Sequence, residues 1–123
     1  MHELSLAKEI VRLVSSELSK RGNPRLLAVR LRIGRLAAVD PEALSFSFQS
    51  IIEDTELAGA RLVIEDVPIR GRCRDCGKEF EIKEGMSFTC PDCSSASCEL
   101  ISGQEFDLIS IEVEGKDEGK TAG

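Results

Sequence analysis

The chain has 123 residues and a formal net charge of −6, with 22 acidic against 16 basic residues. This length suits one compact domain, or one domain with a small satellite, and the acidic balance opposes general attraction to nucleic acid or anionic lipid. No apolar run approaches the roughly 20 residues that cross a bilayer, and no basic segment leads into an apolar one as in a secretory signal. We therefore expect a cytoplasmic globular protein with neither nucleic acid nor membrane as a partner.

Helical periodicity marks the beginning of the chain. Apolar residues recur three or four positions apart from Leu4 to Leu18, which is the stripe of an amphipathic helix that begins at or just after Glu3. Gly22 can take the left-handed conformation that closes a helix, and Pro24 cannot continue one. The alternation of apolar and polar residues from Leu27 to Ile33 then predicts a strand with one apolar face.

A second helix and two further strands follow. Asp40 is the expected N-cap of that helix, with Pro41 at the first helical position. A strand from Arg61 to about Ile69 contains a phase slip that suggests a bulge near residues 66–68, and a last strand runs from Phe106 to Val113. On the second helix the side chains expected to be buried are Leu44, Phe48, Ile51 and Ile52, with Phe46 flanking them.

These elements predict an α+β fold, in which two helices lie on a three-stranded, mostly antiparallel sheet and a module with two C-x-x-C pairs, the pattern of a zinc ribbon, is inserted. The first domain is expected to comprise residues 1–70 together with residues 103–115. The zinc-ribbon domain is expected at residues 71–102. Residues 116–123 are rich in Gly, Lys and Glu and are expected to form a disordered tail.

Four cysteines of the insertion come in two pairs. Cys73 and Cys76 form one C-x-x-C, and thirteen residues separate it from the C-x-x-C of Cys90 and Cys93. This spacing is typical of a zinc ribbon, in which four thiolates bind one ion as a tetrahedron at about 2.3 Å. A redox dithiol and an iron–sulfur cluster are the alternatives, but a redox pair usually stands alone beside a βαβ unit and clusters use other spacings. Because four thiolates leave no open position, the zinc is expected to be structural.

Charge in the insertion bears on nucleic-acid binding, which many zinc ribbons perform. Residues 68–98 hold five basic and five acidic side chains, and the chain has no Trp or Tyr to stack on bases. A zinc-ribbon adaptor for nucleic acid or protein is therefore kept only as the alternative function. We find no nucleophile paired with a base, so no enzyme activity is expected.

The single histidine of the chain is its second residue. The α-amine of Met1 and the amide and imidazole nitrogens of His2 can bind a metal in one plane, which favours Ni(II) or Cu(II) over zinc. Glu3, Asp40, Cys98 or water can supply a fourth donor. Each of the three residues also has a simpler role, since Asp40 is a helix cap, Glu3 a first-turn acid and Cys98 a small buried side chain.

These motifs together resemble the HypA/HybF family of hydrogenase nickel-incorporation proteins. The resemblance extends from Met1 to about Val113. The matching motifs are an N-terminal MHE, the strand VRLRIGRL, a following VDPEAL, the two C-x-x-C pairs and Gly103-Gln104-Glu105. It implies a nickel metallochaperone that works with the GTPase HypB and delivers nickel to the large subunit of NiFe hydrogenase. Some relatives also serve urease maturation, so urease maturation proteins are further candidate partners.

The resemblance also implies which residues bind each metal. The implied nickel ligands are Met1, His2 and Glu3. The implied ligands of a structural zinc are the four paired cysteines, Cys73, Cys76, Cys90 and Cys93. The chain departs from some relatives because no histidine lies near these cysteines to lend a donor to nickel. Any nickel ligand from the zinc module would have to be another residue, such as Cys98.

Overall fold

The computed structural model describes residues 2–83 and 87–115, and the chain divides into two compact units. The helical unit comprises the described residues of Met1–Arg32, Val39–Glu65 and Asp107–Gly123, and the cysteine unit those of Ile33–Ala38 and Asp66–Phe106. Compactness alone does not show which segments fold independently, so the domain boundaries drawn at residues 70 and 103 stay a prediction. The expected tail at 116–123 lies outside the described residues.

Helix α1 (Glu3–Lys20) is the first element of the helical unit, and its beginning confirms the prediction. Four side chains one helical turn apart, Ala7, Ile10, Val14 and Leu18, are buried along one face. The helix ends as its sequence indicates, because Gly22 has φ +81° and the N–H of Asn23 donates to the carbonyl of Leu18 at 2.8 Å. This is the Schellman arrangement, which satisfies carbonyls left open at a helix end.

Helix α2 (Pro41–Ile52) begins at the predicted N-cap. The Asp40 carboxylate accepts from the N–H groups of Glu42 at 3.0 Å and Ala43 at 3.3 Å. Leu44, Phe48 and Ile52 are buried as expected, but Ile51 is only half-buried and Phe46 is 74% exposed. The expectation that Phe46 flanks the core is wrong, because each residue adds about 100° and Phe46 lies about 200° around the helix from Leu44.

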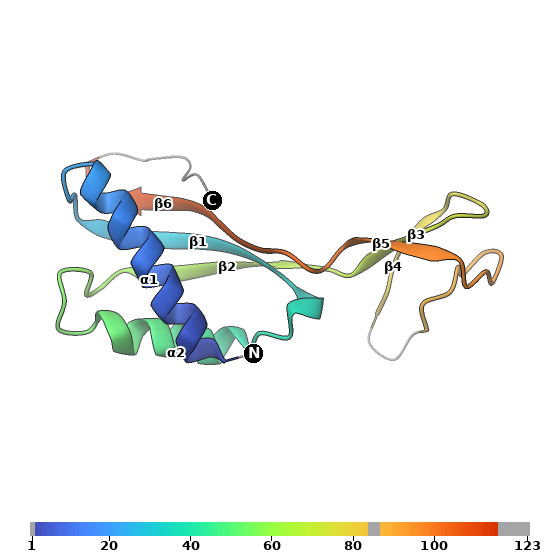
Figure 1. Ribbon diagram of the computed structural model, residues 1–123, viewed down its shortest axis with the longest axis horizontal. Coiled ribbons are helices and arrows are strands. Elements are labelled where there is room, and N and C mark those ends of the chain that lie inside the picture. Colours follow the sequence, from blue (N-terminus) through green and yellow to red (C-terminus); the bar gives the residue numbers. More distant parts are fainter. Residues whose placement is uncertain (1, 84–86, 116–123) are drawn as a thin grey trace. The chain divides into compact units, whose positions relative to one another are not determined.

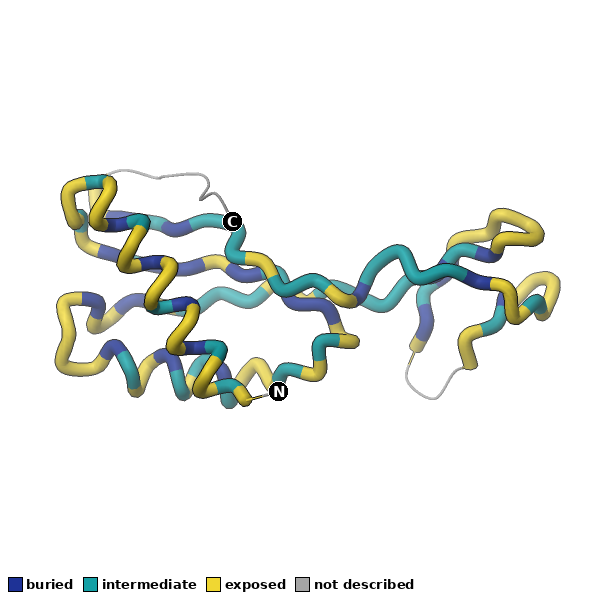
Figure 2. The backbone as a smooth tube through the Cα atoms, in the orientation of Figure 1, coloured by how far each residue is buried: buried dark blue, intermediate teal, exposed yellow. Residues whose placement is uncertain are grey.

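Strands β1 (Leu26–Gly34), β2 (Arg61–Val67) and β6 (Phe106–Val113) form one sheet in the order β2-β1-β6. β6 is antiparallel to β1, since the N–H of Gly34 donates to Glu105 at 2.7 Å and the N–H of Glu114 donates to Arg25 at 2.9 Å. β2 follows β1 through α2, a crossover that leaves the two strands running in the same direction (Figure 1). Buried residues lie along β1 and again at the end of β6 (Figure 2).

The predicted strand from Arg61 to about Ile69 ends two residues earlier than expected. β2 ends at Val67, and β3 (Arg70–Cys73) begins beyond Pro68 in a different sheet. Pro68 cannot donate to a ladder, so it suits the passage between sheets, and its carbonyl accepts the Ser102 hydroxyl at 2.8 Å. The phase slip near residues 66–68 coincides with the end of β2 and the passage to the second sheet.

The second sheet belongs to the cysteine unit. β4 (Glu79–Glu81) and β5 (Cys98–Ser102) flank β3 in the order β4-β3-β5, and both pair antiparallel to it. The α+β class, with two helices, a three-stranded sheet and an inserted four-cysteine module, is thus confirmed, and pairing is antiparallel except between β1 and β2. Within the part of the chain that the structure describes, no helix is both long and apolar enough to cross a membrane.

Gly34, at the end of β1, is the position where the backbone has the least room. A Cβ at this position would lie 2.1 Å from the carbonyl carbon and oxygen of Gly103, which are backbone atoms that cannot rotate away. The φ of Gly34 is −78°, an ordinary value for any residue, so the constraint is steric and not conformational. Here the short helical turn η1 (Arg35–Ala37) follows, and the N–H of Leu36 donates to Gly103 at 2.8 Å.

We expect Gly34→Ala to destabilise the metal-loaded protein by more than about 2 kcal/mol, because the strands must separate to admit the methyl group. Gly22→Ala is the matched control: Gly22 has φ +81° with open space around it, so only backbone strain of about 1 kcal/mol is added. Thermal unfolding followed by circular dichroism measures both. A larger loss for Gly22→Ala would contradict the close approach.

Candidate metal centre

Four sulfur atoms meet in the cysteine unit. The Sγ atoms of Cys73 and Cys93 are 3.6 Å apart and those of Cys76 and Cys90 are 3.5 Å apart. All four lie within 4.8 Å of one another. Four thiolates bound to one zinc ion at about 2.3 Å would be separated by about 3.8 Å, the edge of that tetrahedron. The donor set and its spacing therefore fit a tetrahedral thiolate site.

The two knuckles that present the sulfurs share one backbone conformation. In each, the first cysteine donates its N–H to the carbonyl five residues on and accepts at its own carbonyl from the N–H four residues on, always at 2.9 Å. The four bonds are Cys73 to Lys78, Gly77 to Cys73, Cys90 to Ser95 and Ser94 to Cys90. Amides also point at sulfur, since the N–H groups of Cys76 and Asp92 each lie 3.4 Å from the first sulfur of their knuckle.

The fifth residue of each knuckle has a positive φ. Gly77 has φ +79° and Ser94, the equivalent residue of the second knuckle, has φ +62°. Glycine adopts this region freely, but a serine side chain is strained in it. The Gly77 turn was evident from the sequence, whereas Ser94 was missed. Aligning the two knuckles residue by residue would have revealed that Ser94 occupies the glycine position.

Backbone amides and neighbouring sulfurs shift the pKa values of the four thiols in opposite directions. The N–H of Cys76 lowers the pKa of Cys73 to about 6, and the N–H of Cys93 likewise lowers the pKa of Cys90. The N–H of Ser95 favours the Cys93 thiolate, but the hydrogen bond with Cys73 and burial outweigh it and raise the pKa of Cys93 to about 12. A metal that binds all four sulfurs must therefore displace protons, so its affinity rises with pH.

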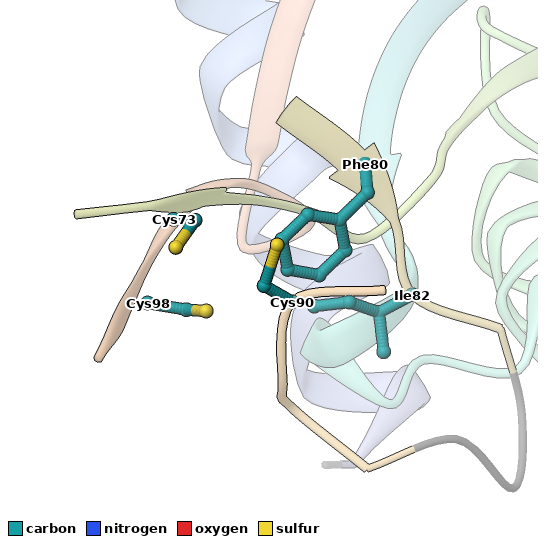
Figure 3. Close-up of a cluster of buried hydrophobic side chains, with 5 residues drawn as sticks. All are labelled: Cys73, Phe80, Ile82, Cys90 and Cys98. Carbon is teal, nitrogen blue, oxygen red and sulfur yellow. The ribbon is translucent and has the colours of Figure 1, made fainter. Parts of the chain in front are cut away.

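The hydrophobic core of this unit is small. It consists of Cys73, Phe80, Ile82, Cys90 and Cys98 (Figure 3). Ile69 packs against this core. Two of its five buried residues are members of the sulfur site. A core of this size supplies little burial free energy, so the metal–sulfur bonds are expected to hold the unit together.

Cys98 lies beside the four-sulfur site but is not a member of it. It pairs with Cys73 across the β3–β5 ladder, it is buried, and its thiol lies 3.5 Å from the carbonyl of Ser95, to which it donates. Burial and the neighbouring charges of Cys73 and Cys90 raise the pKa of Cys98. These features suit the small buried side chain that is one of the two roles expected for Cys98.

The residues expected to bind nickel gather in the helical unit. His2 is exposed and is the N-cap of α1, where its carbonyl accepts from the N–H of Leu6 at 3.1 Å. The Glu3 carboxylate accepts from the N–H of Asp40 at 3.0 Å, and this bond lowers the pKa of Glu3. The structure thus brings His2, Glu3 and Asp40 together, whereas Met1 lies outside the described residues and Cys98 belongs to the other unit.

The bond from Asp40 to Glu3 joins the first turns of the two helices, and sequence reasoning missed it. Both residues carry separate helix-start signals, and nothing in the local pattern shows that the two starts meet. Asp40 is a candidate fourth donor only if the two helix starts lie side by side. The structure satisfies this condition, although the Asp40 carboxylate is already occupied by two N–H groups of α2.

Ser94→Gly is expected to stabilise the metal-loaded cysteine unit by a few tenths of a kcal/mol to about 1 kcal/mol, because it removes the strain of a positive φ. Ser97→Gly, also beside the second knuckle but without a positive φ, should instead lower stability, since it only adds freedom to the unfolded chain. Thermal unfolding of the zinc-loaded variants compares them. Equal effects of the two substitutions would show that Ser94 is not strained.

Cys90→Ser is expected to abolish stoichiometric zinc binding and the dispersed amide signals of the cysteine unit, because one ligand and part of the small core are lost together. Cys98→Ala should keep one zinc per chain, since Cys98 is outside the four-sulfur group. Metal analysis and a two-dimensional NMR spectrum of each variant provide the measurement. Loss of zinc from both variants in equal measure would mean that Cys98 is also a ligand.

Comparison with known proteins now identifies the family. The family model described as "Hydrogenase/urease nickel incorporation, metallochaperone, hypA" matches residues 1–113. Hydrogenase maturation factor HypA of Desulfosudis oleivorans is 42% identical over 114 residues, which are 92% of this chain and 98% of that protein. The protein of the same name from Geobacter metallireducens is 43% identical over 114 residues, covering 93% of this chain and 100% of that protein.

Two solved structures share the fold. The solution structure of the Ni metallochaperone HypA from Helicobacter pylori has a TM-score of 0.62 at 25% identity, covering 92% of this chain and 97% of that one. A solution structure of HypA protein has a TM-score of 0.69 at 25% identity, with 94% and 98% covered. The family model and the relatives, each spanning nine tenths of the chain or more, place this chain in the HypA family of hydrogenase and urease nickel-incorporation metallochaperones.

Proposed function

We propose that this protein carries Ni(II) on Met1, His2 and Glu3 and supplies it for the maturation of NiFe hydrogenase, while a structural Zn(II) occupies the four paired cysteines. The observation that carries the nickel site is the bond from the Asp40 N–H to the Glu3 carboxylate at 3.0 Å. It fastens the residue after His2 to the start of α2, so the imidazole is held at the surface of a folded unit. Membership of a nickel-incorporation family supports the choice of metal.

The two proposed sites differ in how readily they would release their metal ion, as a carrier requires. Amine, amide and imidazole nitrogens can bind a metal in one plane, which suits Ni(II), and His2 is exposed to solvent. Nickel held in this way is open to an acceptor and to protons, both of which can release it. In this proposal Glu3 supplies the remaining donor to nickel, since the Asp40 carboxylate caps α2 and the Cys98 thiol is buried.

Zinc is proposed for the sulfur site because soft thiolates in a tetrahedron are its usual ligands in structural sites. Four sulfurs complete the coordination of the ion, which then has no position for a substrate and no need to leave. Nickel(II) is less suited to this arrangement, since it favours planar sites with nitrogen donors. The sulfur site would hold the cysteine unit folded while the nickel site loads and unloads.

The family indicates hydrogenase-related partners. We propose that these are the GTPase HypB and the large subunit of NiFe hydrogenase, and that urease maturation proteins form a second group. In this proposal the protein is a cytoplasmic carrier and not an enzyme, because its chemistry is the binding and release of a metal ion. The specificity of delivery then rests on which proteins dock beside the nickel site.

One residue added in front of Met1 should lower nickel affinity at least tenfold, because the α-amine is then moved out of the chelate ring. The same residue added after Gly123 is the control and should leave the affinity unchanged. Calorimetric titration of zinc-loaded protein with Ni(II) provides the measurement, with mass spectrometry to verify that the unextended chain begins at Met1. Equal affinity of the two extended proteins would reject the terminal chelate.

A further inference from the structure

The outer face of α2 carries an aromatic ring that the fold does not use. Phe46 is 74% exposed, the highest value for a large apolar side chain among the described residues. Leu44 and Phe48, on either side of it in sequence, are both fully buried. A phenylalanine that projects from a folded helix costs free energy in water, and aromatic residues often anchor protein–protein interfaces.

A shallow hollow lies beside this ring. Its lining includes Phe46, Gln49 and Ile52 of α2, and Ala58 and Gly59 of the turn that follows the helix. Ile52 is 1% exposed, so it belongs to the floor of the hollow, and Glu53 is at its border. The ring thus lies beside a hollow with both apolar and polar lining, which can receive a side chain from a partner while the ring enters the partner.

The charge around this surface has one sign. Between Pro41 and Ala60 the sequence contains no lysine or arginine and has four acidic residues, which are Glu42, Glu53, Asp54 and Glu56. All four are exposed, and within the described residues none forms an ion pair. A partner that covers Phe46 would therefore meet an acidic rim, so charge complementarity calls for lysine or arginine around its own pocket.

The position of this face links it to the nickel site. α2 begins directly after Asp40, whose N–H is bound by the Glu3 carboxylate. Phe46 is six residues further along, which corresponds to about 9 Å of helix rise. A protein seated on Phe46 would thus have its surface within the span of a few side chains of His2, where a metal can be passed directly.

We propose that the outer face of α2, formed by Glu42, Phe46, Gln49 and Glu53 with the adjoining hollow, docks the protein that accepts nickel. The acceptor presents an apolar pocket that takes the Phe46 ring and is bordered by lysine or arginine. This inference rests on the proposed function, because it assumes that nickel leaves from the amino-terminal residues. Docking through one aromatic anchor and a charged rim allows specific but reversible contact, as a carrier needs.

Binding of zinc-loaded and nickel-loaded full-length protein to two probes tests the docking face. The probes are the hydrogenase large subunit and the GTPase HypB of the same organism, each measured by biolayer interferometry. Phe46→Ala should weaken binding of at least one probe tenfold or more, and Glu53→Lys should weaken binding of the same probe and reduce its dependence on salt. Leu36→Ala, which removes a 48% exposed leucine of the cysteine unit, is the control and should change neither affinity by more than twofold.

Fold and nickel loading are checked in the same variants. Phe46→Ala removes an exposed side chain and should leave the circular dichroism spectrum and the nickel stoichiometry unchanged. Affinities of Phe46→Ala within twofold of the unaltered protein for both probes would overturn the docking face, as would a failure of the unaltered protein to bind either probe. The proposed nickel site is judged separately, by the nickel content of the unaltered protein.

Discussion

Four sulfur atoms within 4.8 Å of one another cannot all carry a negative charge unless a cation lies among them. The cysteine unit depends on this constraint, because its three strands are short and its buried core has five residues, two of which belong to the four-sulfur site. Repeated backbone bonds at 2.9 Å aim the two knuckles at one point. The proposed zinc ion would neutralise the repulsion between the thiolates, and its bonds to sulfur would be the main interactions that hold the unit together.

A different kind of contact organises the proposed nickel site. The helical unit has a continuous core of its own, and its two helix starts are joined by one hydrogen bond between the Glu3 carboxylate and the Asp40 N–H. No closed cage of donors is formed there. An exposed imidazole at a helix N-cap is suited to a metal that must be gained and released, whereas the thiolate site is suited to a metal that stays. The same small fold therefore accommodates one permanent and one exchangeable ion in our proposal.

The chain passes between its two units within β1, β2 and β6, and also between Ala38 and Val39, where there is no strand. Ile33–Ala38 belong to the cysteine unit, where Leu36 donates its N–H to Gly103 at 2.8 Å and Arg35 donates to Asp66 at 2.9 Å. The Arg35 ion pair is about half exposed and contributes little on its own. The close approach of Gly34 to Gly103 is the more demanding feature, because it brings two backbones within the space of a missing methyl group.

The sequence by itself determined the helices, the three longer strands, the Asp40 cap and the membership of the four-cysteine group, because each depends on local periodicity or on ligand spacing. Only the tertiary structure decided that Glu3 binds the Asp40 N–H, that Gly34 meets Gly103, that Ser94 is strained and that Phe46 faces solvent. It also ended the predicted strand at Val67 and added β3, β4 and β5, which are too short to show a pattern. These features depend on contacts between segments that are distant in sequence. Local periodicity and spacing do not specify such contacts, because they form only when the chain folds.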